Sequence, residues 1–274
     1  METVTIKACV LPDDNIFLVI WRVIAGGRSE RVNKLRIVGI ISGVFISGIS
    51  CMAAAGEVGV NLGATRVIYP SDSKGVTLSV DNKAENPFLI KSVVLDESTK
   101  KTAPFVVTPP LFRLDGGQRN AIKITRTGGD YPSDRESINW LCVQSIPPEP
   151  DAAWAEGKKE GGGAKASVSV QLSLNSCIKL FVRPDSVQGN PVDVADKVSW
   201  AIKGGNITAS NPTPFYMNIS EASVNGKKLN MERSYIPPFS DEKYLLPKGV
   251  DKATVRWTVV GDYGEKKEKS VTMN

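Results

Sequence analysis

The segment 167–184 alternates apolar and polar residues with a period of two, and this pattern constrains the fold more than any other feature of the chain. The apolar positions that would share one face of a strand are Val168, Val170, Leu172 and Leu174. Such a face is typical of a strand that packs on a hydrophobic core. The same run later carries Lys179 among apolar neighbours. A cation in that setting needs an anionic or hydrogen-bonding partner.

Short β-rich runs recur along the rest of the chain, separated by clusters of Gly, Pro, Asn and Asp. They are 76–80, 88–95, 121–125, 138–143, 168–182, 198–202, 215–219 and 253–260. No amphipathic helix stands out between them. A chain of 274 residues has room for two small cores, so the pattern predicts an all-β protein made of two sandwiches. The best boundary is 184–191, which holds two prolines and a glycine. We expect domains at 56–183 and 192–274.

Residues 33–55 have the pattern of a secretory signal peptide. Two cations precede an apolar run at 37–49, and three alanines at 53–55 offer a cleavage site. We therefore expect residues 1–55, an upstream extension plus the signal peptide, to be removed during export. A permanent membrane anchor and a lipoprotein modified at Cys51 are the alternatives. The apolar run is short for a membrane span.

Composition argues against catalysis. Histidine is absent, which excludes Ser-His-Asp and Cys-His nucleophile systems and histidine metal sites. The net charge of +5, without interleaved basic and aromatic residues, indicates no nucleic-acid partner. The remaining enzyme hypothesis would pair Asp134 with Glu136, but both flank Arg135 and favour ion pairs instead. We expect no enzyme, no metal and no cofactor.

Two cysteines remain after residues 1–55 are removed, namely Cys142 and Cys177. An even pair in an exported chain is expected to be oxidised. The loop of about 36 residues would contribute on the order of 4 kcal/mol in the chain-entropy model. The spacing is too long for a redox Cys-x-x-Cys motif or a zinc site.

Residues 131–148, YPSDRESINWLCVQSIPP, resemble the signature of the periplasmic pilus-assembly chaperones of the chaperone-usher pathway. Other landmarks of that family are spread along the chain. They are ATRVIYP at 64–70, NPFLI at 86–90, TPPLFRLDGGQ at 108–118, NPTPFY at 211–216 and DYG at 262–264. The resemblance covers nearly everything after residue 56. It implies two immunoglobulin-like β-sandwich domains joined at an angle, with a cleft between them.

The resemblance implies a chaperone that captures, folds and caps fimbrial or surface-fibre subunits and delivers them to an outer-membrane usher. The alternating strand would be lent to a subunit whose sandwich lacks one strand, by donor-strand complementation. Arg66 and Lys179 match a pair that holds the terminal carboxylate of the subunit. A charged trio that fixes the two domains is matched by Glu136, Arg183 and Asp262. Unrelated surface cations and a solvated charge cluster are the alternatives for these two groups.

An insertion at 149–166 separates the two cysteine-bearing segments. Such an insertion resembles the long-loop branch of the family, whose clients form thin, capsule-like or adhesive fibres. Its glycines and lysines are typical of a flexible segment. An exported all-β fibre subunit or adhesin is the alternative function, but it would be expected to have a single incomplete sandwich.

The exposed apolar strand also predicts a second kind of partner. A bare apolar edge promotes aggregation unless something covers it. We therefore expect the client-free chaperone to self-associate through the donor strand and through a second alternating run. That run contains Val58, Val60 and Leu62, and we expect it to lie beside the donor strand.

Overall fold

The computed structural model describes residues 7–10, 59–148, 172–203, 205–247 and 253–273. These residues form β-strands and one short 3₁₀ helix, η1 (Pro191–Lys197), which confirms the all-β expectation. No helix in the described ranges is long and apolar enough to cross a membrane. The predicted signal peptide at 33–55 and the donor residues Val168 and Val170 lie outside the described residues.

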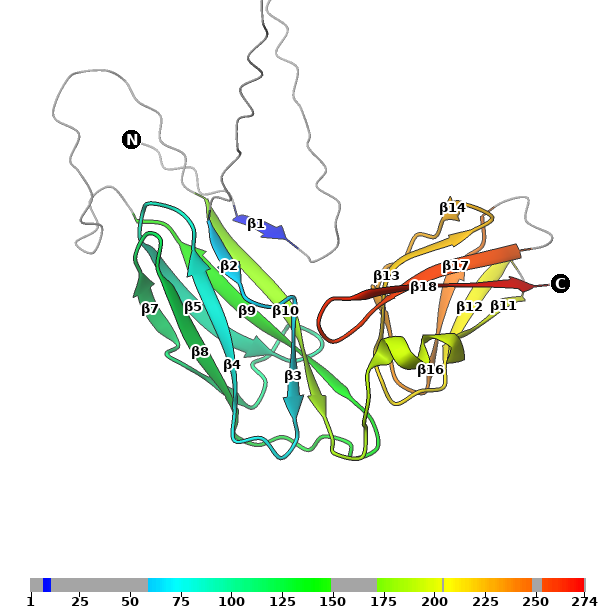
Figure 1. Cartoon of the computed structure of the whole chain (residues 1–274), viewed down its shortest axis with the longest axis horizontal. Coiled ribbons are helices and arrows are strands. Elements are labelled where there is room, and N and C mark those ends of the chain that lie inside the picture. Colours follow the sequence, from blue (N-terminus) through cyan, green and yellow to red (C-terminus); the bar gives the residue numbers. More distant parts are fainter. Residues whose placement is uncertain (1–6, 11–58, 149–171, 204, 248–252, 274) are drawn as a thin grey trace, which may run out of the picture. The chain divides into compact units, whose positions relative to one another are not determined.

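The first half of the chain is a sandwich of two sheets (Figure 1). One sheet contains, in order, β10 (Ser173–Arg183), β9 (Ser137–Ile146), β5 (Phe88–Leu95) and β7 (Leu111–Leu114). On the other edge of β10 lie β3 (Arg66–Pro70) and β1 (Lys7–Val10), both parallel to it. The facing sheet contains β2 (Val60–Leu62), β4 (Val76–Asn82), β8 (Arg119–Arg126) and β6 (Phe105–Thr108). Their apolar faces enclose a core that includes Val80, Ile90, Leu114, Ile122, Leu141 and Leu180.

The second half is a sandwich with its own core. Its smaller sheet is made of β11 (Ser199–Lys203), β12 (Asn206–Asn211) and β16 (Ser240–Leu245). The larger sheet contains β14 (Lys227–Lys228), β13 (Met217–Val224), β17 (Ala253–Val260) and β18 (Lys266–Met273), with β15 (Tyr235–Ile236) also paired to β13. The core between them includes Trp200, Ile207, Met217, Ile219, Val255 and Trp257.

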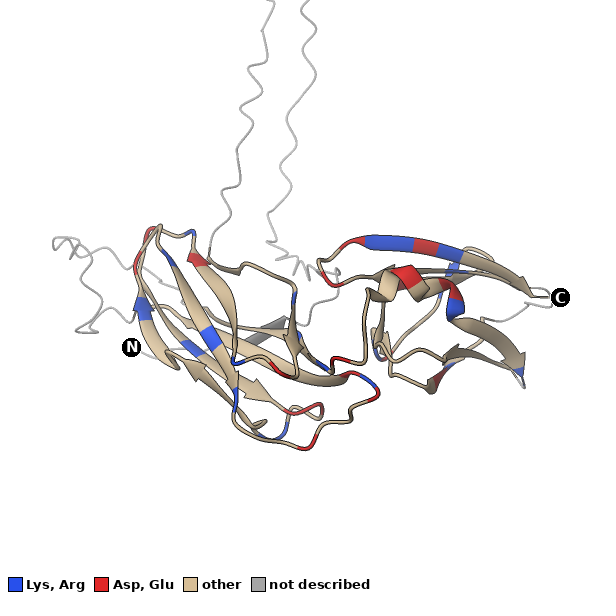
Figure 2. Cartoon of the chain, turned by 60° about the horizontal axis from the view of Figure 1, so that its bottom comes forward, with Lys and Arg blue, Asp and Glu red and all other residues tan. Residues whose placement is uncertain are grey.

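The edge strand β18 is strongly charged. Its first four residues are Lys266, Lys267, Glu268 and Lys269, and Figure 2 shows charged residues running along the strand. Charged side chains on an edge strand discourage pairing with another chain, because pairing would remove them from water. The outer edge of this sheet is therefore protected against strand addition.

The first strand of the N-terminal sandwich corrects one sequence prediction. We expected the run that contains Val60 and Leu62 to lie beside the donor strand, but β2 pairs antiparallel with β4, in the opposite sheet. The chain then changes sheets between Leu62 and Arg66, and β3 pairs with β10 instead. Gly63 is still bonded to β4 through its amide, which donates to the carbonyl of Ser79 at 3.0 Å, so the crossing follows it. The prediction for Val58 falls outside the described residues.

Several predicted strands coincide with observed ones, and β5 and β17 match at both ends. The run predicted at 215–219 is displaced, because Phe215 belongs to a turn and β13 begins at Met217. The side chain of Asn211 holds this turn: its Oδ1 accepts the amide of Thr213, and its Nδ2 donates to the carbonyl of Phe215. A side chain that competes for backbone groups in this way favours a turn over a strand.

An asparagine occupies the same structural role in each half of the chain. Asn82 and Asn211 each end a strand, and each exposes at most 2 % of its surface. The Nδ2 group of Asn82 donates to the carbonyls of Asn86, Leu114 and Asp115 at 2.8, 3.1 and 3.1 Å. The Nδ2 group of Asn211 donates to the carbonyls of Phe215, Ile236 and Pro237 at 2.8, 3.2 and 2.9 Å. In each sandwich, one buried asparagine therefore satisfies three backbone carbonyls.

We expect Asn82→Ala and Asn211→Ala each to lower the free energy of unfolding by about 2 kcal/mol or more. Each substitution leaves buried carbonyls without a donor, and each such group costs about 1–3 kcal/mol. Urea unfolding of the variants measures the effect. Asn120→Ala is the matched control, since Asn120 is exposed and accepts only from the neighbouring amide of Ala121. Equal losses in all three variants would contradict this account.

Candidate functional site

One face of β10 completes the core of its own sandwich and then continues past the end of that core. The residues of this face expose 1 % of their surface at Val182, 0 % at Leu180, 7 % at Ile178 and 48 % at Leu172, with Leu174 half-buried. Val168 and Val170 continue the same period-two series toward the N-terminal side. Apart from Ser176, this face is apolar, and it is buried at one end of the strand and exposed at the other.

The edge of β10 that faces away from β9 is occupied along two stretches. β3 pairs with residues 179–183 of β10, and β1 pairs with residues 173–176. Both added strands run parallel to β10. No charged residue occurs from Leu172 to Ile178, in contrast to β18. β1 belongs to the segment that we expect to be removed on export, and without it this uncharged stretch of β10 could accept an added strand without burying a charge of its own.

Arg66 and Lys179 lie directly opposite each other in the pairing of β3 with β10. Paired residues share a face of the sheet, so the structure brings the two predicted cations together. Lys179 exposes 8 % of its surface, and its Nζ donates to the Oγ of Ser234 at 2.8 Å. The Lys179 ammonium also lies 5.2 Å from the ring centre of Tyr235. These neighbours come from the second half of the chain.

Arg66 uses only part of its donor capacity. Its Nη1 donates to the carbonyl of Val260 at 3.2 Å, while its Nε is buried and has no hydrogen-bond partner among the described residues. Burial lowers the pKa of Arg66, and the nearby carboxylates of Asp262 and Glu265 act in the opposite direction. An unsatisfied charged donor is costly. The arrangement therefore favours an anionic acceptor at this point.

The predicted charged trio is also in contact. Arg183 forms a bidentate pair with Asp262, with Nη1–Oδ2 and Nη2–Oδ1 distances of 2.6 and 2.8 Å. Its Nε donates to Oε1 of Glu136 at 2.7 Å. The other oxygen of Glu136 accepts the amide of Tyr216 at 2.7 Å. Burial raises the pKa of the Glu136 carboxyl, and Arg183 and the Tyr216 amide offset part of that increase.

The carboxylate pair considered for an enzyme does not form a site. Asp134 is exposed and pairs with its neighbour Arg135, whereas Glu136 is 3 % exposed and binds Arg183. The two carboxylates therefore have different partners and different environments.

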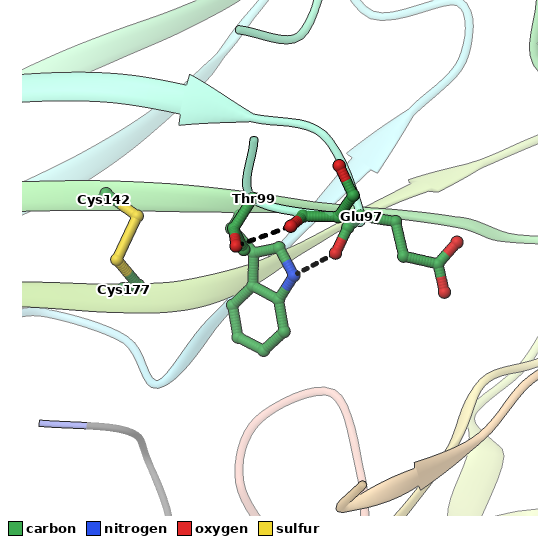
Figure 3. The surroundings of a disulfide bond; sticks show 6 residues. Glu97, Thr99, Cys142 and Cys177 are labelled. Atoms are coloured by element: carbon green, nitrogen blue, oxygen red, sulfur yellow. Dashed lines mark hydrogen bonds between the residues drawn. A yellow bond between two sulfur atoms is a disulfide. The ribbon is translucent and has the colours of Figure 1, made fainter. Parts of the chain in front are cut away.

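The predicted disulfide joins Cys142 and Cys177, which are directly opposite each other on β9 and β10 (Figure 3). Two residues further along both strands, Trp140 lies opposite Lys179. The Trp140 indole donates to the carbonyl of Glu97 at 3.3 Å, as drawn in Figure 3. The bridge thus fixes the register that places the lysine on the outer face of the sheet.

Sequence reasoning missed the aromatic cluster around the lysine. Its buried members are Ile138, Phe181, Tyr216 and Tyr235, with Ile68 and Trp140 packed against them. Phe181 follows Lys179 at period two on the same strand, which was the available signal. The tyrosines come from distant segments, so no local pattern could have placed them. Burial, followed by the nearby Glu97 carboxylate, raises the pKa of Tyr235 to about 12, so its hydroxyl stays protonated.

We expect Arg183→Ala to lower the free energy of unfolding by about 3–5 kcal/mol. Removing the guanidinium leaves the buried Glu136 carboxylate without its cation, and breaking one partner of a buried pair has a cost of this size. Urea unfolding monitored by tryptophan fluorescence measures it. Arg135→Ala is the matched control, because its partner Asp134 is exposed, and it should leave the midpoint unchanged. A midpoint for Arg183→Ala equal to that of the control would refute the prediction.

Protein-family models match both halves of the chain. Residues 59–188 match the model described as pili and flagellar-assembly chaperone, PapD N-terminal domain. Residues 193–271 match the model described as pili assembly chaperone PapD, C-terminal domain.

Individual relatives agree with these matches. The chaperone protein AfaB of Escherichia coli is 55 % identical over 190 residues, which cover 69 % of this chain and 76 % of AfaB. The crystal structure of the E. coli chaperone DraB is 48 % identical, with a TM-score of 0.67, and the match covers 79 % of this chain and 99 % of DraB. A chain in the structure of the Salmonella enterica SafA pilin in complex with the SafB chaperone has 39 % sequence identity to this chain and a TM-score of 0.68. The match covers 79 % of this chain and 97 % of that one.

Proposed function

The chain belongs to the family of PapD-like pilus-assembly chaperones, and from this premise we propose that it captures, folds and caps fimbrial or surface-fibre subunits in the periplasm and delivers them to an outer-membrane usher. It is a chaperone and not a fibre subunit, since it has two complete sandwiches, each with its own core. The structure of SafB with the SafA pilin supports a pilin-like client for this chain as well. We assign no catalytic residue to it.

The observation that carries this proposal is the apolar face of β10 that runs past its own core. A subunit that lacks one strand could pair with this segment and bury Leu172 and Leu174 in its own core, together with Val168 and Val170. Each such side chain would contribute about 1.5–3 kcal/mol before ordering costs. Backbone hydrogen bonds along the uncharged edge would add affinity that depends little on the sequence of the client.

The pair Arg66 and Lys179 is proposed to bind the terminal carboxylate of the client. Support comes from their opposed positions on β3 and β10 and from the unpartnered Nε of Arg66. Charge-assisted hydrogen bonds in a partly dry site are strong and directional. A carboxylate held there would fix how the client strand registers along β10, because it sets the distance from its chain end to each exposed apolar residue.

We propose that the mature protein consists of domains at 56–183 and 192–274 with a hinge at 184–191. The separate hydrophobic cores support this division. The trio of Glu136, Arg183 and Asp262 is proposed to hold the two domains in a fixed arrangement, which its three short ion-pair contacts support. The insertion at 149–166 supports assignment to the long-loop branch, with clients that form thin or adhesive fibres.

Arg66→Ala and Lys179→Ala should each leave the chaperone folded but reduce recovery of client at least tenfold. Without one cation, the client carboxylate would be buried with too few donors, at a cost of about 2–5 kcal/mol. Co-purification of a co-expressed pilin-like fibre subunit provides the measurement, with thermal melting as the folding check. Arg113→Ala removes an exposed cation paired to Asp115 and is the control. Undiminished recovery with both anchor variants would show that this role is wrongly assigned.

Client-free protein should self-associate through the exposed part of β10, and client binding should reverse this. The motivating observation is the 48 % exposure of Leu172 at an uncharged edge. Sedimentation of the protein with and without client measures its association state. A Val170→Asp/Leu172→Asp double variant should abolish both client capture and self-association. A wild-type protein that is monomeric at tens of micromolar, corresponding to about 6 kcal/mol of association, would rule out self-association.

A further inference from the structure

Tyr263 is the most exposed of the large hydrophobic side chains in the described part of the chain. It exposes 93 % of its surface, compared with 82 % for Leu245 and 55 % for Leu111. The residue lies in the turn between β17 and β18, inside the Asp262–Gly264 sequence. An aromatic side chain held fully in water has a large apolar area available for a partner.

The turn that carries Tyr263 is fixed by a dense set of hydrogen bonds. The Tyr263 amide donates to the Glu265 carboxylate at 2.9 Å, and the Gly261 amide donates to the Glu265 carbonyl at 2.8 Å. The same carboxylate accepts from the side chain of Asn190 at 2.6 Å. Asp262, the preceding residue, is held by both terminal nitrogens of Arg183. The backbone of Tyr263 is therefore constrained, and only its side-chain torsions remain free.

The turn lies against the strand that carries Arg66. The carbonyl of Val260, at the end of β17, accepts from the guanidinium of Arg66. On the other side of Tyr263, a Cβ added at Gly264 would lie 3.5 Å from the Oγ1 of Thr65. The backbone of the turn therefore passes close to residues 65–66 on both sides of Tyr263. The Tyr263 side chain extends into solvent from this turn.

We propose that Tyr263 is a contact residue for the client subunit and packs on an apolar side chain close to the terminal carboxylate of that subunit. This inference rests on the proposed function of Arg66 and Lys179. A tyrosine suits the role because its ring supplies a large contact area while only two side-chain torsions become ordered on binding. Aromatic residues are also enriched among the residues that dominate protein interfaces.

The position of Tyr263 also gives a reason for an exposed aromatic side chain on a turn that is held by hydrogen bonds. The proposed anchor would fix the end of the client chain close to the β17–β18 turn, so the client side chains nearest that end are the ones within reach of Tyr263. A preformed aromatic platform next to the anchor selects clients with an apolar residue there. Every chain ends in a carboxylate, so the anchor alone would not distinguish one client from another. Tyr263 would add that specificity.

The test compares Tyr263→Ser, Tyr263→Phe and wild type, each co-expressed with the pilin-like fibre subunit used for the Arg66 and Lys179 variants. The rate at which the purified complex dissociates is measured from the transfer of its subunit to an excess of tagged wild-type chaperone. We expect Tyr263→Ser to dissociate at least tenfold faster, while Tyr263→Phe stays within about threefold of wild type. Melting temperatures should be unchanged, because the side chain is exposed.

Leu245→Ser is the matched control, since Leu245 is also highly exposed but lies on β16, in the other sheet of the same half. It should dissociate at the wild-type rate. If Tyr263→Ser also behaves as wild type while Arg66→Ala loses the subunit, the inference about Tyr263 is wrong and the proposed function stands. If Tyr263→Ser holds subunit normally but its complex no longer binds the usher, Tyr263 belongs to the usher interface and the inference is overturned. If the wild-type protein captures no subunit, the proposed function and the inference about Tyr263 are both wrong.

Discussion

The pleat of β10 is the constraint on which the rest of the structure depends. Successive side chains of a strand point to opposite faces. Ile178, Leu180 and Val182 therefore enter the core, and the residues between them must face outward. The outward series contains Cys177, Lys179 and Phe181, which supply the disulfide, the predicted anchor and the aromatic cluster. A shift of one residue in register would bury the lysine in the core and expose the leucine.

Pairing on both sides of β10 fixes that register. The Cys142–Cys177 bridge joins it covalently to β9, and β3 pairs with it along residues 179–183. Arg66 can lie opposite Lys179 because the chain crosses from one sheet to the other between Gly63 and Arg66. The cost of desolvating so many charges is reduced where each has partners, as in the contacts of Arg183 with Glu136 and Asp262.

Local pattern was enough to predict the elements whose residues lie near one another in sequence. The alternation of 168–182 predicted a strand, and the structure has one at 173–183; the two cysteines that follow the predicted signal peptide predicted the bridge. The path of β2 was not predictable in this way, because its three residues carry no signal for one sheet over the other. Ser234 and Tyr235 likewise reach Lys179 from more than 50 positions away. The buried asparagines Asn82 and Asn211 share a geometry that their flanking sequences do not reveal.

The distribution of charge among the edge strands determines how many neighbours this protein can hold. In the described part of the chain, the edge strands β1, β2, β6, β7, β14 and β15 have at most four residues, and the edge strands β3, β11, β16 and β18 carry charged side chains. Removal of β1 with the segment that we expect to be cleaved would add one further edge, the uncharged stretch of β10 at 173–178. In the language of polymer chemistry, the proposed donor strand would give the molecule a valence of one. A fibre subunit must join two neighbours to propagate a chain, whereas a monovalent unit can terminate growth and cannot extend it.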